Sequence, residues 1–320
     1  MPYNSIISRT DAAALIPEDV SSELLQGVQE QSAVMQMARR LQNMSRGQER
    51  VPVLSALASA YFVSGDTGLK QTTEVNWTNK YLYAEEIAAI VAIPEAVLDD
   101  ADYDIWGEVR PQLETAFGAV IDAATLYGSN IPANWTTSLG GAGIVAVANA
   151  AGHQISNAAY TDLYEAIMSE TPAGVDGLLM LIEADGYMAT GHIAHTSFRG
   201  KLRGVRDADG NPIFTTSMQQ AGQYLLDGAP IMFPRNGAIS ATYWDITGDW
   251  SQLVYSMRQD ITYKILDQAV IQDAAGNILY NLAQQDMVAL RAVMRMGVAL
   301  PHPVTRMDSG TGCAFAALTA

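Results

Sequence analysis

The residues best suited to chemistry are four histidines, namely His153, His192, His195 and His302. His192 and His195 are three residues apart, and on the helix that we predict for this segment both side chains would reach one metal ion. No cysteine or further carboxylate follows at ligand spacing. We therefore interpret these histidines as surface residues, and we predict no metal site and no other cofactor.

Motifs of hydrolytic and nucleotide-binding enzymes are absent or incomplete. No Gly-x-Ser-x-Gly elbow occurs, although a Ser–His–acid triad can assemble from residues at any spacing. The glycine run at 140–143 lacks the Gly-Lys-Ser/Thr end of a phosphate loop and predicts a hinge. Asp207 and Asp209 resemble the start of a calcium loop, but Pro212 and Met218 replace its Gly and Glu, which favours a hairpin turn at 207–211. The sequence predicts no catalytic residue.

Charged residues are clustered along the chain. Residues 85–122 contain ten acidic residues and one base, Arg110. Nothing distinguishes a catalytic carboxylate pair among them from a hydrated acidic helix. The basic residues form two groups: Arg39, Arg40, Arg46 and Arg50, and then Arg199, Lys201, Arg203 and Arg206. Each cluster alone fits a solvated face, but together they predict complementary patches for subunit contacts.

The composition limits the class of protein. The 320 residues are 49% hydrophobic and only 16% charged, whereas about 25% is usual for soluble proteins, so surface burial in an assembly is indicated. The formal charge of −16 argues against a protein that binds DNA through its phosphates. Cys313 is the one cysteine, which excludes an intrachain disulfide. We find no signal peptide, and no apolar run reaches membrane length, so we predict no membrane association.

Apolar spacing predicts a mixed α+β chain. Residues 1–16 are predicted as an extended arm, 94–104 as an acidic connector, and 129–152 as a flexible crossing between domains. Helices are expected from Pro17, after the N-cap Ser32 as far as Leu41, over 104–127 with Pro111 starting or kinking it, over 158–170, and from residue 184 to about Arg203. Strands are expected at 51–54, 61–63, 75–83, 177–183, 228–234, 253–257, 261–265 and 287–300.

The hairpin formed by the strands between residues 49 and 93 has aromatic side chains but no obvious core. A two-stranded hairpin is marginally stable alone in water, so it must lie on the rest of the chain or on a neighbour. We take its exposed residues, with two arginines before it, as candidates for a subunit interface. These candidates are Tyr61, Phe62, Lys70, Trp77, Tyr81, Arg39 and Arg40.

The order of these features resembles the major capsid protein of tailed bacteriophages, with the Hong Kong 97-like (Johnson) fold. The resemblance extends from about Ile16 to Leu318 and depends on many weak marks in the right order. They include the segments 15–20, 30–35, 51–54, 60–63, 85–94, 98–104, 109–113, 126–128, 207–212, 228–231, 248–252 and 295–300.

The resemblance implies a role for each part. Residues 1–48 would be the N-terminal arm, 49–93 the extended loop over a neighbouring subunit, and 94–128 the peripheral domain with its spine helix. Residues 129–250 would form the axial domain, 251–303 the returning peripheral strands, and 304–320 the return to the axial domain. The chain would assemble through hexamers and pentamers, in the host cytoplasm, into the icosahedral head of a virion. That head would enclose double-stranded DNA without sequence-specific binding.

Some members of the family join subunits by an isopeptide bond between a Lys of the extended loop and an Asn, with a Glu as proton acceptor. Lys70 lies in the corresponding loop, but Asp286 occupies the Asn position and Val293 the Glu position, with Asn281 the nearest substitute acceptor. Valine cannot act as a base, so we predict a shell without covalent cross-links.

Two other functions are kept as alternatives. An encapsulin, a nanocompartment shell of the same fold, would enclose protein cargo instead of a genome. A soluble hydrolase would use the acidic helix or the histidine pair. For the capsid we expect a portal as a partner, and a decoration protein is a further candidate. The family's N-terminal scaffolding domain is missing, because the arm begins close to Met1, so either a separate scaffolding protein guides assembly or none is needed.

Overall fold

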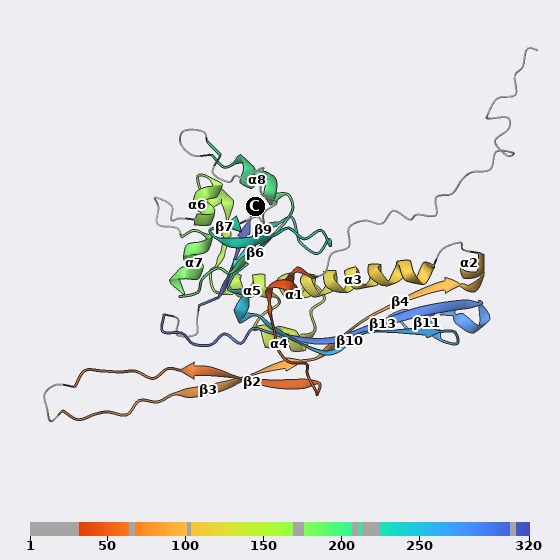
Figure 1. Ribbon diagram of the computed structural model, residues 1–320, viewed down its shortest axis with the longest axis horizontal. Coiled ribbons are helices and arrows are strands. Elements are labelled where there is room, and N and C mark those ends of the chain that lie inside the picture. The colour runs from red at the N-terminus through yellow and green to blue at the C-terminus, as the bar shows by residue number, and fades with distance from the viewer. Residues whose placement is uncertain are drawn as a thin grey trace, which may run out of the picture.

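The computed structural model describes residues 32–63, 68–100, 104–168, 176–206, 211–212, 225–307 and 312–320. Two large sheets, their covering helices and two two-stranded hairpins make up this part of the chain (Figure 1), so the α+β prediction is confirmed at this level. The predicted arm at 1–16, the helix from Pro17 and the turn at 207–211 lie outside the described residues, apart from residue 211.

A four-stranded sheet extends away from the centre of the molecule (Figure 1). Its order is β1 (Arg39–Arg40), β10 (Val254–Leu266), β13 (Met287–Ala299) and β4 (Glu85–Pro94). β13 is antiparallel to both β10 and β4. The long helix α3 (Ile105–Tyr127) covers one face of this sheet, where Leu113 and Phe117 pack with Leu290 and Ala292. The strands predicted at 253–257 and 261–265 are one continuous strand, β10, with two register irregularities.

Side chains at both ends fix the length of α3. The carboxylate of Asp104 accepts a hydrogen bond from the Gly107 N–H at 3.1 Å and caps the first turn. Gly128 ends the helix in the left-handed conformation, with φ 69°. Pro111 lies inside the helix, six residues after its first residue, so it does not start the regular part.

The second sheet has six strands in the order β5 (Gln154–Ser156), β14 (Phe315–Thr319), β9 (Tyr243–Gly248), β6 (Gly191–Ala194), β8 (Ala229–Met232) and β7 (Leu225–Leu226). Around it lie α5 (Ile144–Ala150), α6 (Leu163–Met168), α7 (Leu178–Ala184) and α8 (Phe198–Gly204). Most of the large buried side chains belong here, and Trp250 packs edge-on against Phe315 with ring centroids 5.1 Å apart. This half therefore contains the main hydrophobic core.

The prediction of a flexible crossing at 129–152 is wrong, because the segment folds into α4 (Ala133–Leu139) and α5. The glycine run between these helices forms a compact turn. Gly143 has φ 90°, and a Cβ at this position would lie 2.5 Å from the backbone nitrogen of Gly128. Only glycine fits so close to the end of α3, so the run packs against α3 and does not form the predicted hinge.

The strand predicted at 177–183 is also wrong, because these residues form α7. Leu178, Leu179 and Ile182 are buried on one side of it, and a short apolar run cannot distinguish a buried helix from a buried strand. The helix expected from residue 184 to Arg203 is replaced by strand β6 followed by α8, and the helix expected at 158–170 begins only at Leu163, as α6.

The remaining elements are short. α1 (Ala33–Met37) begins after the predicted N-cap Ser32 but ends before Leu41, and α2 (Glu95–Asp100) replaces much of the predicted connector. β2 (Gln48–Ala56) and β3 (Asn76–Tyr83) form the predicted hairpin, whereas residues 61–63 are not a strand. β11 (Val270–Gln272) and β12 (Ile278–Asn281) form a second hairpin between β10 and β13.

A buried carboxylate connects α1 to α3. Asp122 of α3 accepts hydrogen bonds from the Ser32 hydroxyl at 2.5 Å and from the backbone N–H groups of Ala33 and Val34 at 3.0 and 3.1 Å. The Asn236 amide donates a fourth, at 2.6 Å. Burial raises the pKa of Asp122, and these four hydrogen bonds oppose the rise. The carboxylate thus fixes the start of the described chain to the middle of the molecule.

We expect Asp122→Asn to destabilise the protein. One carboxylate oxygen would become an NH₂ group facing two donors, and leaving buried donors unpaired costs about 2 kcal/mol or more. Asp104→Asn is the matched control, because Asn caps a helix about as well as Asp does. Thermal unfolding of both variants tests this, and equal melting temperatures would exclude an anchoring role for Asp122.

Candidate subunit interface

The hairpin β2–β3 extends away from both sheets (Figure 1). Its strands pair antiparallel, with Leu54 opposite Trp77. Beyond the strands the two arms stay connected, because the Ser59 N–H donates to the Thr73 hydroxyl at 2.9 Å and the Tyr61 hydroxyl donates to the Gln71 carbonyl at 3.0 Å. The hairpin is therefore an ordered projection over the described part of its length.

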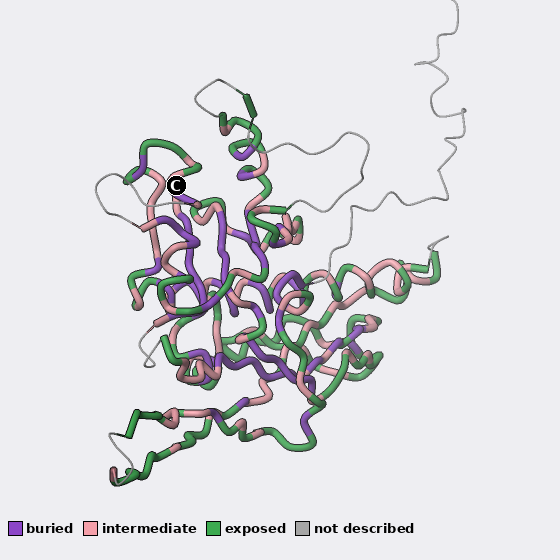
Figure 2. The backbone as a smooth tube through the Cα atoms, turned by 60° about the vertical axis from the view of Figure 1, so that its left-hand side comes forward, coloured by how far each residue is buried: buried purple, intermediate pink, exposed green. Residues whose placement is uncertain are grey.

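Only the part of this hairpin nearest the body of the molecule is buried (Figure 2), and its buried side chains are Val53 and Leu82. Leu82 packs there with Met44, Val254 and Ala299. Farther out, large apolar side chains face solvent: Tyr61, Phe62, Leu69, Trp77 and Tyr81 are all exposed, Trp77 by 67%. A ribbon of two strands has no interior in which to hide them. The hairpin thus presents apolar surface that the chain itself does not cover.

Lys70 is exposed in the same loop. The residues at the acceptor and base positions of the isopeptide reaction lie in the four-stranded sheet or near it. Asp286 precedes β13 in a left-handed conformation, with φ 48°, and its carbonyl accepts the Glu95 N–H at 2.9 Å. Val293 is half-buried in β13 opposite Ala88, and Asn281 ends β12. The described chain does not bring Lys70 together with any of them.

Arg39 and Arg40 form β1 at the edge of the four-stranded sheet, and both side chains are exposed. The Arg40 guanidinium donates to the Asn43 side chain at 3.1 Å. Arg46 and Arg50 are exposed in the following segment, near the root of the hairpin. Most described acidic residues of 85–122 lie instead on α2 and along α3. Among the described side chains, no salt bridge joins Arg39, Arg40, Arg46 or Arg50 to an acidic residue of 85–122.

His192 and His195 do not lie on a helix as predicted, and the prediction that they are surface residues is wrong for His192. His192 lies in strand β6, where its Nδ1 is 2.8 Å from the Asp245 carboxylate, and His195 follows the strand with Nδ1 2.8 Å from the Ser197 hydroxyl. His192 and Asp245 are fully buried, so no substrate can reach them. His153 is also buried, and its Nε2 lies 3.2 Å from Asp185. These pairs cross-link core elements. In the described segments we find no cluster of three or more His, Cys, Asp or Glu side chains fit to hold a metal.

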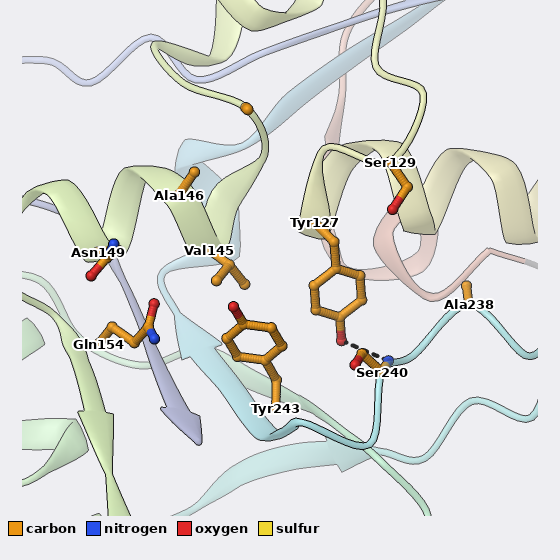
Figure 3. A pocket seen from close by; sticks show the side chains of 10 residues that line it. Tyr127, Ser129, Val145, Ala146, Asn149, Gln154, Ala238, Ser240 and Tyr243 are labelled. Atoms are coloured by element: carbon orange, nitrogen blue, oxygen red, sulfur yellow. Dashed lines mark hydrogen bonds between the residues drawn. The ribbon is translucent and has the colours of Figure 1, made fainter. Parts of the chain in front are cut away.

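A polar pocket of about 420 Å³ opens between the end of α3, helix α5 and strand β9 (Figure 3). Tyr127 and Tyr243 stack in it with ring centroids 5.3 Å apart. The Tyr127 hydroxyl accepts the Ser240 N–H at 3.2 Å, and burial raises the pKa of Tyr127 to about 12. This phenol stays neutral at physiological pH. The other lining side chains include the hydroxyls of Ser129 and Ser240, but no histidine, lysine or carboxylate that could activate them as a general base.

The prediction missed a basic surface on the four-stranded sheet. Lys264, Arg291 and Arg295 all project from the face opposite α3. In the sequence, the alternation of Arg291 and Arg295 with the apolar residues Leu290, Ala292 and Met294 indicates that these two arginines lie on one face of the strand.

Among the helices that the structure describes, none has both the length and the apolar character needed to cross a bilayer.

Comparison with known proteins gives a consistent result. The model of the phage capsid family matches residues 12–304. The major capsid protein of Staphylococcus phage 80alpha is 24% identical over 93% of this chain and 85% of its own length. A solved structure from Microbacterium phage Oxtober96 has 33% identity and a TM-score of 0.80, covering 98% of this chain and 99% of that one. Another, from Mycobacterium phage Cain, has 30% identity and a TM-score of 0.79 over 98% of both chains.

We expect Trp77→Ala to impair association between chains more than it impairs folding. The side chain is mostly exposed, so its removal leaves no cavity in the chain. At an interface, loss of such an aromatic anchor costs about 2 kcal/mol or more. Trp135→Ala is the contrasting variant, since Trp135 is buried and its loss should lower the melting temperature of the chain itself. Equal destabilisation of the isolated chain and of its assemblies by Trp77→Ala would contradict the interface role.

Proposed function

The chain belongs to the phage capsid family, and we propose that it is the major capsid protein of a tailed double-stranded DNA phage. Copies assemble through hexamers and pentamers into an icosahedral head around the genome. As a member of this family the chain is a structural component of the virion and not an enzyme. The observation that carries the proposal is the exposed apolar hairpin β2–β3.

The hairpin requires a neighbour because of its surface. Trp77, Leu69 and Phe62 are too exposed for a free-standing ribbon, and a contiguous apolar surface of this kind marks an interaction site. In a shell, the hairpin of each subunit lies over the next one and its aromatic side chains become buried. Tyr61, Tyr81 and Lys70 are then interface residues, and so are Arg39 and Arg40 near the root of the hairpin.

We assign the parts of the fold accordingly. Residues 1–48 are the N-terminal arm and 49–93 the extended loop. The four-stranded sheet and α3 supply the peripheral domain, from 94–128 and 251–303, with α3 as the spine helix. The six-stranded sheet belongs to the axial domain, from 129–250 and 304–320. The axial domain contains most of the buried core, which suits a rigid wedge at the centre of a hexamer or pentamer.

Further partners follow from the family. A portal and a separate scaffolding protein would act during assembly, and a decoration protein could bind the finished shell. DNA would be enclosed without sequence-specific contacts, in keeping with the net charge of −16.

Two alternatives are less well supported. An encapsulin shares the shell architecture, but the two solved structures compared above, which have 30% identity or more at high coverage, come from phages. A soluble hydrolase would need catalytic residues that a substrate can reach, but the pair of His192 and Asp245 is fully buried.

We expect the purified chain to form closed shells, since symmetric closure buries the same surface on every copy. Negative-stain microscopy and sedimentation test this directly. Nuclease-protected DNA inside particles purified from infected cells supports a capsid, whereas protein cargo without DNA would support the encapsulin alternative. A stable monomer by light scattering, or residues 60–80 packed wholly within one subunit, would overturn the proposal.

We also expect mature particles without covalent cross-links. An isopeptide bond needs a neutral amine, a carboxamide and a base, whereas Asp286 supplies a carboxylate and Val293 supplies no base. Boiled particles should give a single band near 34.4 kDa on a denaturing gel. Ladders of larger species that disappear in Lys70→Ala would show that a cross-link forms through Lys70, with Asn281 as the first acceptor to test.

A further inference from the structure

One face of the four-stranded sheet is open. Side chains alternate along each strand, so Leu290 and Ala292 of β13 meet α3 while Arg291 and Val293 point to the opposite face. The strand register places three rows on that face: Ile90, Arg291 and Lys264; then Ala88, Val293 and Thr262; then Glu86, Arg295 and Gln259. We call these residues the open face. None of them is classed as buried.

The open face concentrates positive charge in an acidic protein. Lys264 and Arg291 are direct cross-strand partners, and such neighbours have Cβ atoms about 5 Å apart. Like charges in this position destabilise a sheet. Arg295 has Glu86 at 3.9 Å, but among the described side chains no carboxylate forms a salt bridge with Lys264 or Arg291. An anionic partner from outside the chain would remove this repulsion.

The face also has an apolar part. Ile90 is 47% exposed in the same row as the two cations, and Val293 lies half-buried in the next row. A partner that fits the open face therefore combines an apolar side chain with carboxylates. Phosphate groups alone would satisfy the cations but leave Ile90 in water.

Helix α2 has the complementary surface. It begins where β4 ends, and Glu95, Asp99 and Asp100 are all exposed on it together with Val97, which is 49% exposed. Helix α2 contains no basic residue and no buried residue. Its place at the outer end of the sheet is clear in Figure 1. α2 thus offers one apolar side chain flanked by carboxylates.

We propose that the open face of one subunit binds helix α2 of a second copy, with Lys264 and Arg291 opposite Asp99 and Asp100 and Ile90 against Val97. This inference rests on the proposed shell function and names one contact within it. The row of Ile90 is four residues from the end of β4, or about 13 Å along the strand, so both surfaces lie at the same end of the sheet. A rotation about an axis near that end brings each α2 onto the next open face, and the repeated contact closes a ring.

A charge-swap experiment on the full-length chain tests the contact. Lys264→Glu with Arg291→Glu should prevent the formation of shells, because four carboxylates would then meet. Asp99→Lys with Asp100→Lys should prevent it equally, because four cations would meet. All four changes in one chain should restore particles, since the opposite charges face each other again with the signs exchanged. Particles are counted by sedimentation and negative stain, and circular dichroism melting confirms that each chain folds.

The outcomes separate this inference from the function on which it rests. If the wild-type chain makes no closed particles, the proposed function fails. If the wild type assembles and either paired reversal assembles normally, the α2 contact is excluded. If both reversals fail and the combined chain, folded by its melting curve, also fails, then the open face binds some other acidic partner and our assignment of α2 is wrong.

Discussion

A two-stranded ribbon has no interior, and β2 and β3 form one. Every large apolar side chain beyond its root must therefore face either water or another molecule. This constraint explains why the hairpin is anchored so firmly where it leaves the body: Leu82 is fully buried, and the Trp135 indole and the Ser138 hydroxyl donate to carbonyls of β3 at 3.1 and 2.9 Å. A hairpin with a rigid root and an exposed apolar outer part is suited to packing on a neighbouring subunit.

The rest of the fold gives the hairpin a defined direction. Helix α3 covers one face of the four-stranded sheet, and its buried Asp122 holds α1 and the loop of Asn236. Residues 39–44 then follow β10, with backbone bonds from Arg39, Leu41 and Met44, before the chain enters β2. One carboxylate and one sheet edge thus connect the segment that precedes the hairpin to both halves of the molecule. A subunit that must repeat an identical contact many times requires this rigidity.

The sequence predicted the long periodic elements well and the short apolar ones poorly. α3 was predicted almost to the residue, because its apolar stripe is long and Asp104 and Gly128 mark its ends. The run at 177–183 failed as a strand because its five consecutive apolar residues, 178–182, fit a buried helix equally. The exposed hairpin candidates could be identified from aromatic spacing without an accompanying core. The open face could be identified only in part: the alternation along β13 places Arg291 and Arg295 on one face, but only the register of β10 and β13 brings Lys264 beside Arg291.

The sheet edges suggest why association uses side-chain faces. Strands at an edge expose unpaired N–H and carbonyl groups and readily pair with other chains. The edge strand β10 has register shifts in its pairing with β13, between Met257 and Gln259 and between Gln259 and Thr262, and such bulges bend a strand and increase its twist, which hinders flat pairing at its outer edge. Pairing through backbone groups is indifferent to sequence, whereas an apolar centre flanked by charges selects both partner and register. Two of the 18 basic residues are neighbours on the open face and form no salt bridge with a described carboxylate, so the chain has the means to restrict how its copies meet.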